Sequence, residues 1–104
     1  MNDVADIPLK VIVDKLCELA PDLKALGVTR LSLFGSRARG DARADSDLDV
    51  LVDTTATGTE PTFDYFAVQH LIEDRMGLHT HVAQRELLKP RIAARISDDL
   101  IEVF

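Results

Sequence analysis

Two short segments with strand patterns, residues 28–34 and 48–52, most constrain the fold of this chain. The first alternates between two sets of side chains, contains β-branched and aromatic residues, and stops at Gly35. The second is nearly continuous in apolar residues, which is typical of a strand in the middle of a sheet. Residues 35–46, between them, are small, charged and rich in turn formers. The sequence therefore predicts two strands joined by a polar connection.

The segment that precedes these strands, residues 8–26, has the periodicity of a helix. Its leucines and isoleucine recur at steps of three and four, which places them on one helix face. These residues are Leu9, Ile12, Leu16, Leu19, Leu23 and Leu26. Pro21 removes a backbone donor and crowds the preceding turn, so we expect it to kink or restart the helix. Gly27 is expected to end it.

The second half of the chain repeats this alternation of helix and strand. We expect a helix from about residue 61 to 76, a short strand at 79–83 and an amphipathic helix at 86–96 that is interrupted or restarted at Pro90. Residues 101–104 are expected to finish as a strand or as an extension of that helix. The expected apolar face of the 61–76 helix consists of Phe63, Phe66, Ala67 and Leu71. Strands separated by helices predict an α/β fold with helices packed on a small sheet.

Length and charge set the class of protein. The 104 residues fit one domain that spans 1–104, and the formal net charge of −6 argues against a broad basic surface that coats nucleic acid. A single cysteine, Cys17, allows no internal disulfide, and no Cys/His cluster has zinc spacing. The N-terminus is acidic where a secretory signal is basic, and no apolar run is long enough to span a membrane. We therefore expect a cytoplasmic domain with no membrane partner and no direct nucleic-acid binding.

The polar connection after the first strand has the composition of a phosphate-binding site. The strand ends at Gly35 and Ser36, where a short helical turn can begin. Free N–H groups, a hydroxyl and a residue without Cβ form a seat for phosphate oxygens. Arg37, Arg39 and Arg43 add three cations in an otherwise acidic chain.

Paired carboxylates begin the second strand. Asp47 and Asp49 flank Leu48, and strand alternation places both carboxylates on one face while Leu48 points into the core. Two carboxylates side by side repel each other unless a cation bridges them, and Mg²⁺ usually binds one or two carboxylates together with substrate phosphates. A Gly-Ser turn or an Asp-x-Asp pair alone is common in turns and strand starts. Together, at this separation, they indicate a nucleotide–metal site.

This arrangement resembles a known family. Gly35-Ser36, ten intervening residues and then Asp47-Leu48-Asp49 is similar to the signature of the polymerase-β-like nucleotidyltransferases, and the chain's length and the Ser46–Asp49 segment resemble the minimal nucleotidyltransferase branch. The resemblance implies a mixed α/β core and transfer of a nucleotide monophosphate from a nucleoside triphosphate such as ATP, with release of pyrophosphate. It also implies that Asp47 and Asp49 hold Mg²⁺ and that Ser36 with its neighbouring amides holds the β- and γ-phosphates.

The chain departs from this family at one position. Members usually carry a third acid on a later strand, after a glycine, and His81 stands at that place within residues 77–83. A histidine can accept a proton near neutral pH or ligate a softer metal, but it supplies no negative charge. It can also be merely a strand residue, with the acid elsewhere or activity reduced. Glu73, Asp74 and Glu86 are near in sequence, but none fits the strand pattern.

The resemblance also carries an expectation about the acceptor. Minimal nucleotidyltransferases lack the further domains that position a bulky acceptor, so a partner protein is expected to supply it. Similar proteins act as antitoxins of HEPN-domain ribonuclease toxins, which implies transfer of AMP from ATP to a toxin tyrosine. A second hypothesis, motivated by His81, is a catalytically weak or inactive domain that binds and masks the toxin. A less favoured third is a small-molecule nucleotidyltransferase acting, for example, on an aminoglycoside.

Overall fold

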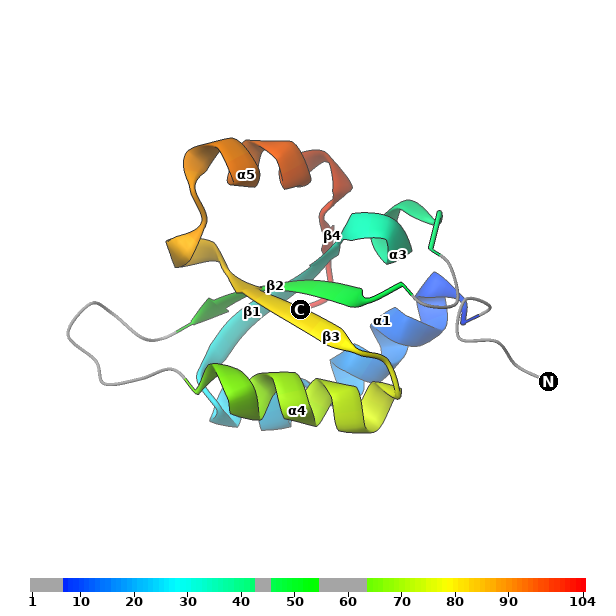
Figure 1. The fold of residues 1–104 in the computed structure, drawn as a ribbon. Coiled ribbons are helices and arrows are strands. Elements are labelled where there is room, and N and C mark those ends of the chain that lie inside the picture. The colour runs from blue at the N-terminus through cyan, green and yellow to red at the C-terminus, as the bar shows by residue number, and fades with distance from the viewer. Residues whose placement is uncertain (1–6, 43–45, 55–63) are drawn as a thin grey trace.

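A computed structural model describes residues 7–42, 46–54 and 64–104, which form one four-stranded sheet with helices on both faces (Figure 1). The elements, in chain order, are α1 (Leu9–Glu18), α2 (Ala20–Ala25), β1 (Val28–Phe34), α3 (Gly35–Arg39), β2 (Leu48–Thr54), α4 (Tyr65–Met76), β3 (Thr80–Gln84), the 3₁₀ turn η2 (Arg85–Leu87), α5 (Pro90–Ile96), the 3₁₀ turn η3 (Ser97–Asp99) and β4 (Ile101–Glu102). In Figure 1, α1 and α4 lie on one side of the sheet and α5 lies on the other.

The sheet is mixed, in the order β3-β2-β1-β4. Strand β1 runs antiparallel to both β2 and β4, whereas β2 and β3 are parallel. A parallel pair needs a crossover connection, and α4 supplies it between β2 and β3. The predicted fold class, a small mixed sheet with helices packed on it, is confirmed. The prediction of a strand within the sheet at residues 48–52 is also confirmed, because β2 has a neighbour on each side.

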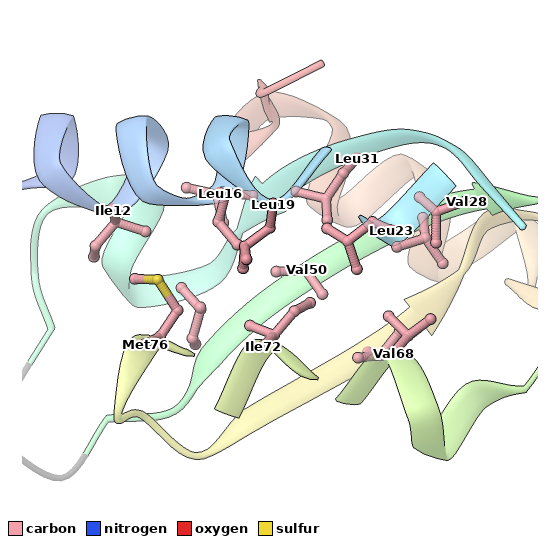
Figure 2. Close-up of a cluster of buried hydrophobic side chains, with 14 of the residues drawn as sticks. Ile12, Leu16, Leu19, Leu23, Val28, Leu31, Val50, Val68, Ile72 and Met76 are labelled. Carbon is pink, nitrogen blue, oxygen red and sulfur yellow. The ribbon is translucent and has the colours of Figure 1, made fainter. Parts of the chain in front are cut away.

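The hydrophobic core lies between the sheet and the helices α1, α2 and α4, which cover one of its two faces. Figure 2 shows Ile12 and Leu16 of α1 pointing towards Ile72 and Met76 of α4, with Val50 of β2 between them. These five side chains are at most 6% exposed. The predicted face of the first helical segment is confirmed at its four central positions, since the following residues are buried: Ile12, Leu16, Leu19 and Leu23.

Both prolines that were expected to interrupt helices do so. The first helical segment ends at Glu18 and restarts as α2, with Pro21 in the first turn of the new helix. Helix α5 starts at Pro90, after the separate turn η2. In a first turn the missing proline N–H removes no helical hydrogen bond, so each proline marks a start. Residues 101–102 pair with β1 as a strand, the first of the two expected outcomes.

The expected apolar face of α4 is correct only in part, because Leu71 packs against the core while Phe66 does not, and Phe63 lies outside the described residues. Phe66 is 66% exposed, and the buried side chains are Val68, Ile72 and Met76, which recur every four residues. Apolar residues lie on more than one side of this helix, so spacing alone does not select its buried face. The helix begins at Tyr65, where the Asp64 side chain accepts a hydrogen bond from the Ala67 N–H at 3.0 Å. The expected start at residues 61 and 62 lies outside the described residues.

Across the three described ranges, no helix has the length and apolar content needed to cross a lipid bilayer.

Candidate active site

The turn from β1 into α3 is packed against the second strand. Gly35 has a φ of 79°, in the left-handed region that favours glycine. A Cβ built at Gly35 would overlap the carboxylate of Asp49 on β2. Register places Phe34, at the end of β1, opposite Asp49, which brings the two strands together at this point. A glycine is therefore required both by the backbone conformation and by the space that Asp49 occupies.

The two aspartates differ in their surroundings. Asp49 lies within β2 with its side chain 24% exposed, whereas Asp47 lies immediately before the strand and is exposed. Between them, Leu48 is fully buried in the core, as strand alternation predicts. Burial raises the pKa of Asp49, and the negative charge of Asp47 raises it further, while His81 and Arg39 act in the opposite direction. The ionised form of Asp49 is therefore destabilised in this site, and a bound cation would stabilise it.

His81 lies beside Asp49. The parallel register of β2 and β3 pairs these two residues, and Nδ1 of His81 is 3.5 Å from Oδ1 of Asp49. The imidazole is 61% exposed, so a ligand can reach it. The position at which the resemblance implies a third acid is thus next to the aspartate pair in space, although it is 32 residues further along the chain than Asp49.

The other nearby acids bind elsewhere. Glu73 accepts a hydrogen bond from the Thr80 N–H at 3.0 Å and lies 2.9 Å from Nδ1 of His79, which ties α4 to the start of β3. Glu86 accepts one from the Thr54 N–H at 3.1 Å. Both carboxylates therefore hold structural contacts in this fold.

The three arginines of the polar connection have different positions. Arg39 is half exposed, and its guanidinium binds Asp41 at 3.2 Å and Asp99 at 3.0 Å. Arg37 is only 4% exposed and donates from Nη2 to the Ser46 carbonyl at 3.0 Å. That burial differs from the surface phosphate contact expected of Arg37, because the side chain instead fixes the segment just before Asp47. Arg43 lies outside the described residues.

Ser36 is in the first turn of α3, directly after Gly35. Its carbonyl accepts hydrogen bonds from the N–H groups of Gly40 and Asp41, at 2.9 and 3.0 Å, at the end of the short helix. Gly40 has a φ of 87° and ends α3 as a left-handed cap. The structure thus brings Gly35, Ser36, Asp49 and His81 to one end of the β1–β2–β3 sheet.

The sequence analysis did not identify two further acidic residues that form ion pairs in this part of the fold, Asp53 and Asp99. Asp53 lies on β2 at the same alternation as Asp49 and binds Arg85 at 2.6 Å, which anchors η2 to the sheet. Its strand position could have identified it. The contact of Asp99 with Arg39 of α3 could not be predicted from local sequence, because the two residues are 60 positions apart.

The residues fit a magnesium ion that also binds a nucleotide. Carboxylate oxygens are the donors that Mg²⁺ prefers, and Asp47 and Asp49 would hold it. The described ranges contain no group of three or more histidine, cysteine, aspartate or glutamate side chains that could hold a metal on its own. Mg²⁺ bound through one or two carboxylates takes its remaining ligands from substrate phosphates and water, so two carboxylates are enough.

Comparison with solved structures places this fold in a class. The chain superposes with a TM-score of 0.72 on a structure described as a minimal nucleotidyltransferase, with 29% identity over 92% of this chain and 96% of the other. It also superposes, with a TM-score of 0.65 and 11% identity, on a complex of a tri-AMPylated HEPN toxin of Shewanella oneidensis with its MNT antitoxin, covering 92% of this chain and 71% of the matched one. The fold is that of a nucleotidyltransferase.

Sequence comparison then gives the family. Residues 9–103 match the nucleotidyltransferase domain family, and the chain belongs to it. The chain is 30% identical to the protein adenylyltransferase MntA of Thermococcus cleftensis over 77 residues, which is 74% of this chain and 76% of that protein. The predicted resemblance to minimal nucleotidyltransferases is confirmed.

Proposed function

We propose that this protein is a Mg²⁺-dependent adenylyltransferase that acts in the cytoplasm as an antitoxin and transfers AMP from ATP to a tyrosine of a HEPN-domain ribonuclease toxin. The observation that carries the proposal is the packing of Asp49 against Gly35 at the start of α3. It joins the two halves of the sequence motif, the Gly-Ser turn and the aspartate pair, at one place.

In this proposal the residues of the chain have separate roles. Ser36, with the backbone at Gly35, binds the β- and γ-phosphates, and Arg39 adds a half-exposed cation nearby. Asp47 and Asp49 hold the magnesium ion, which supplies charge stabilisation on the phosphates when bound. The tyrosine oxygen forms a bond to the α-phosphorus, the bond from that phosphorus to the pyrophosphate oxygen breaks, and the hydroxyl proton leaves. Pyrophosphate is released.

Two findings support a protein acceptor. The relative from Thermococcus cleftensis is a protein adenylyltransferase, and the Shewanella oneidensis complex pairs an AMPylated HEPN toxin with an antitoxin of the same fold.

The proposal is tested by incubating the protein with ATP labelled at the α-phosphate, Mg²⁺ and the HEPN-domain protein encoded beside it. Label is expected on the partner and is expected to disappear when its acceptor tyrosine is changed to phenylalanine. Asp49→Asn is expected to lower transfer by at least 100-fold. Asp74→Asn is the matched control, because that carboxylate is 82% exposed and lies on α4. Absence of label on the partner, or equal transfer by Asp49→Asn and Asp74→Asn, rejects the proposed adenylyltransferase activity.

One observation favours a second candidate, an antitoxin that masks the toxin without chemistry. His81 occupies the strand position beside Asp49 at which the family usually carries an acid. In this alternative, neutralisation of the toxin depends on binding alone. Survival of neutralisation in the Asp47→Asn/Asp49→Asn double variant, with unchanged partner binding, supports masking. Loss of neutralisation with binding retained supports transfer.

A further inference from the structure

Helix α5 carries a group of basic residues that form no ion pair. Lys89 directly precedes the helix, and Arg91 and Arg95 lie about one turn apart on its exposed side. Within the described ranges, none of the three forms an ion pair with an acidic side chain. The basic side chains that do form such pairs there are Lys10, Arg30, Arg39, Arg75 and Arg85. The chain has a net charge of −6, so a shortage of acids does not explain the difference.

These charges oppose the helix on which they lie. Lys89 and Arg91 are at the N-terminal end of α5, where the helix dipole disfavours cations, and the first turn contains no acid. Arg91 and Arg95 are four residues apart, a spacing at which like charges on a helix repel each other. The fold therefore gives no reason for this arrangement. A local charge pattern that opposes its own helix is expected at a functional surface.

Exposed apolar side chains lie among these cations. Ile92 of α5 is 44% exposed, and Leu87 of η2 is 74% exposed. An open depression is lined by Lys89, Pro90, Arg91 and Ile92. We define the α5 surface as Leu87, Lys89, Arg91, Ile92 and Arg95. Arginine together with exposed apolar side chains is typical of protein–protein interfaces, whereas a surface that binds nucleic acid mainly presents polar and charged groups to phosphates.

Helix α5 lies on the same side of the sheet as the candidate active site. Leu48 and Val50 point into the core, so strand alternation turns Asp49 to the opposite face of the sheet. Figure 1 shows α5 on that face. The ion pair between Arg39 of α3 and Asp99 of η3, at 3.0 Å, joins the segment that follows α5 to the site. A protein bound to the α5 surface would therefore lie next to the site.

We propose that the α5 surface docks an acidic, partly apolar surface of the acceptor protein. The proposal rests on the proposed function and adds to it the place and the chemistry of the partner contact. Carboxylates of the acceptor protein pair with Lys89, Arg91 and Arg95, and Leu87 and Ile92 supply the apolar contact. Because the chain as a whole is acidic, an acidic partner is attracted to this surface and repelled by the remainder, which fixes its orientation.

The variant Arg91→Glu tests the surface without weakening the helix. The new carboxylate lies near the positive end of the α5 dipole and four residues before Arg95, and both placements stabilise a helix. The melting temperature is therefore expected to stay level or rise. Lys15→Glu is the matched control, because it makes the same change of charge at an exposed residue of α1, on the other side of the sheet.

The experiment measures binding of the HEPN-domain protein encoded beside this one, by calorimetry without ATP, at low and high NaCl concentration. Wild-type affinity is expected to fall as the salt concentration rises. At low salt, Arg91→Glu is expected to weaken binding at least about tenfold, and Lys15→Glu is expected to change it by less than about twofold. Ile92→Ala is also expected to weaken binding, whereas Val11→Ala, at an exposed apolar residue of α1, is expected to leave it unchanged.

Other occupants of the α5 surface give different results. A labelled single-stranded RNA is titrated into the same variants, and self-association is followed by sedimentation velocity; neither is expected to depend on Arg91. The proposal is overturned if the wild type does not bind the HEPN-domain protein, if Arg91→Glu binds it as the wild type does, or if Lys15→Glu weakens binding equally. It is also overturned if Arg91→Glu removes RNA binding or self-association. Failure of the proposed function is distinguishable, because it is read as absence of label on a partner that still binds.

Discussion

Gly35, the first residue of α3, and Asp49 of β2 are in direct contact: the carboxylate of Asp49 fills the space that a Cβ of residue 35 would need. The two residues are the first member of the Gly-Ser turn and the last member of the aspartate pair. Their contact explains why the motif needs its glycine. It couples the position of the proposed phosphate-binding turn to that of the proposed metal ligand.

The first prediction concerns Gly35→Ala. We expect it to destabilise the fold by about 2–4 kcal/mol, because a left-handed backbone costs an alanine roughly 1–2 kcal/mol and the overlap with Asp49 adds strain. It is also expected to abolish transfer by displacing Asp49. Urea unfolding measures the stability.

Gly40→Ala is the control for this prediction. Gly40 also has a positive φ, but a Cβ there meets nothing within 4 Å. Gly40→Ala is expected to lower the free energy of unfolding only by the cost of a left-handed alanine, about 1–2 kcal/mol, and to retain transfer activity. Equal loss of stability in the two alanine variants would contradict the proposed role of the Gly35–Asp49 contact.

The second prediction concerns Asp49→Asn in the presence of a chelator. Burial raises the pKa of Asp49 in the folded chain, so ionisation of this carboxyl costs folding free energy at neutral pH. The cost vanishes as pH falls below the pKa of the unfolded state, where the carboxyl is protonated in both states. We therefore expect the variant to melt above the wild type at neutral pH and level with it in acid.

Differential scanning fluorimetry at the two pH values measures this. Asp47→Asn serves for comparison and is expected to show a smaller gain, because Asp47 is exposed. A lower melting temperature for Asp49→Asn at neutral pH is the opposite of what burial predicts.

The order and type of the elements could be predicted from the sequence because local patterns determine them. The steps of three and four in residues 9–26, and the prolines at 21 and 90, gave helices and restarts that the structure contains. The buried face of α4 could not be predicted. Val68, Ile72 and Met76 are buried there and Leu71 is partly buried, whereas Phe66, which is equally apolar, is exposed. Contact with the rest of the core selects between these positions, and helix spacing alone does not show it.

The same distinction applies to the site. The aspartate pair and the Gly-Ser turn are short-range features, and they were recognised. The neighbour of Asp49 on β3 depends on the register of a parallel pair, and only the family resemblance pointed to His81. Burial of Arg37 was missed because arginine is usually exposed, and nothing local shows that its guanidinium meets the Ser46 carbonyl.

The third prediction separates Ser36 from Arg37. Ser36→Ala is expected to weaken ATP binding by about 1–3 kcal/mol, the value of a charge-assisted hydrogen bond, and to change unfolding free energy by less than about 1 kcal/mol. Arg37→Ala is expected to lower unfolding free energy by about 1–3 kcal/mol, since a buried hydrogen bond to Ser46 is lost. Calorimetric ATP titration and urea unfolding measure the two quantities. Unchanged ATP affinity after Ser36→Ala rejects this placement of the phosphates.

The fourth prediction is a pH dependence of stability that originates at Glu73. The hydrogen bond from the Thr80 N–H is the largest of the contacts that lower the pKa of Glu73 in the folded chain. A lowered folded pKa stabilises the fold above the pKa of the unfolded carboxyl, and this stabilisation is lost as pH falls through the lower, folded value.

Glu73→Gln removes that contribution, so its melting temperature is expected to lie below the wild type at neutral pH. The difference is expected to shrink as the pH falls through the folded pKa of Glu73, below the usual range of glutamate carboxyls. Asp74→Asn, at the exposed neighbouring position, is expected to leave the pH dependence of the wild type unchanged. If the wild type and Glu73→Gln lose stability in parallel on acidification, the contact between α4 and β3 does not depend on the charge of Glu73.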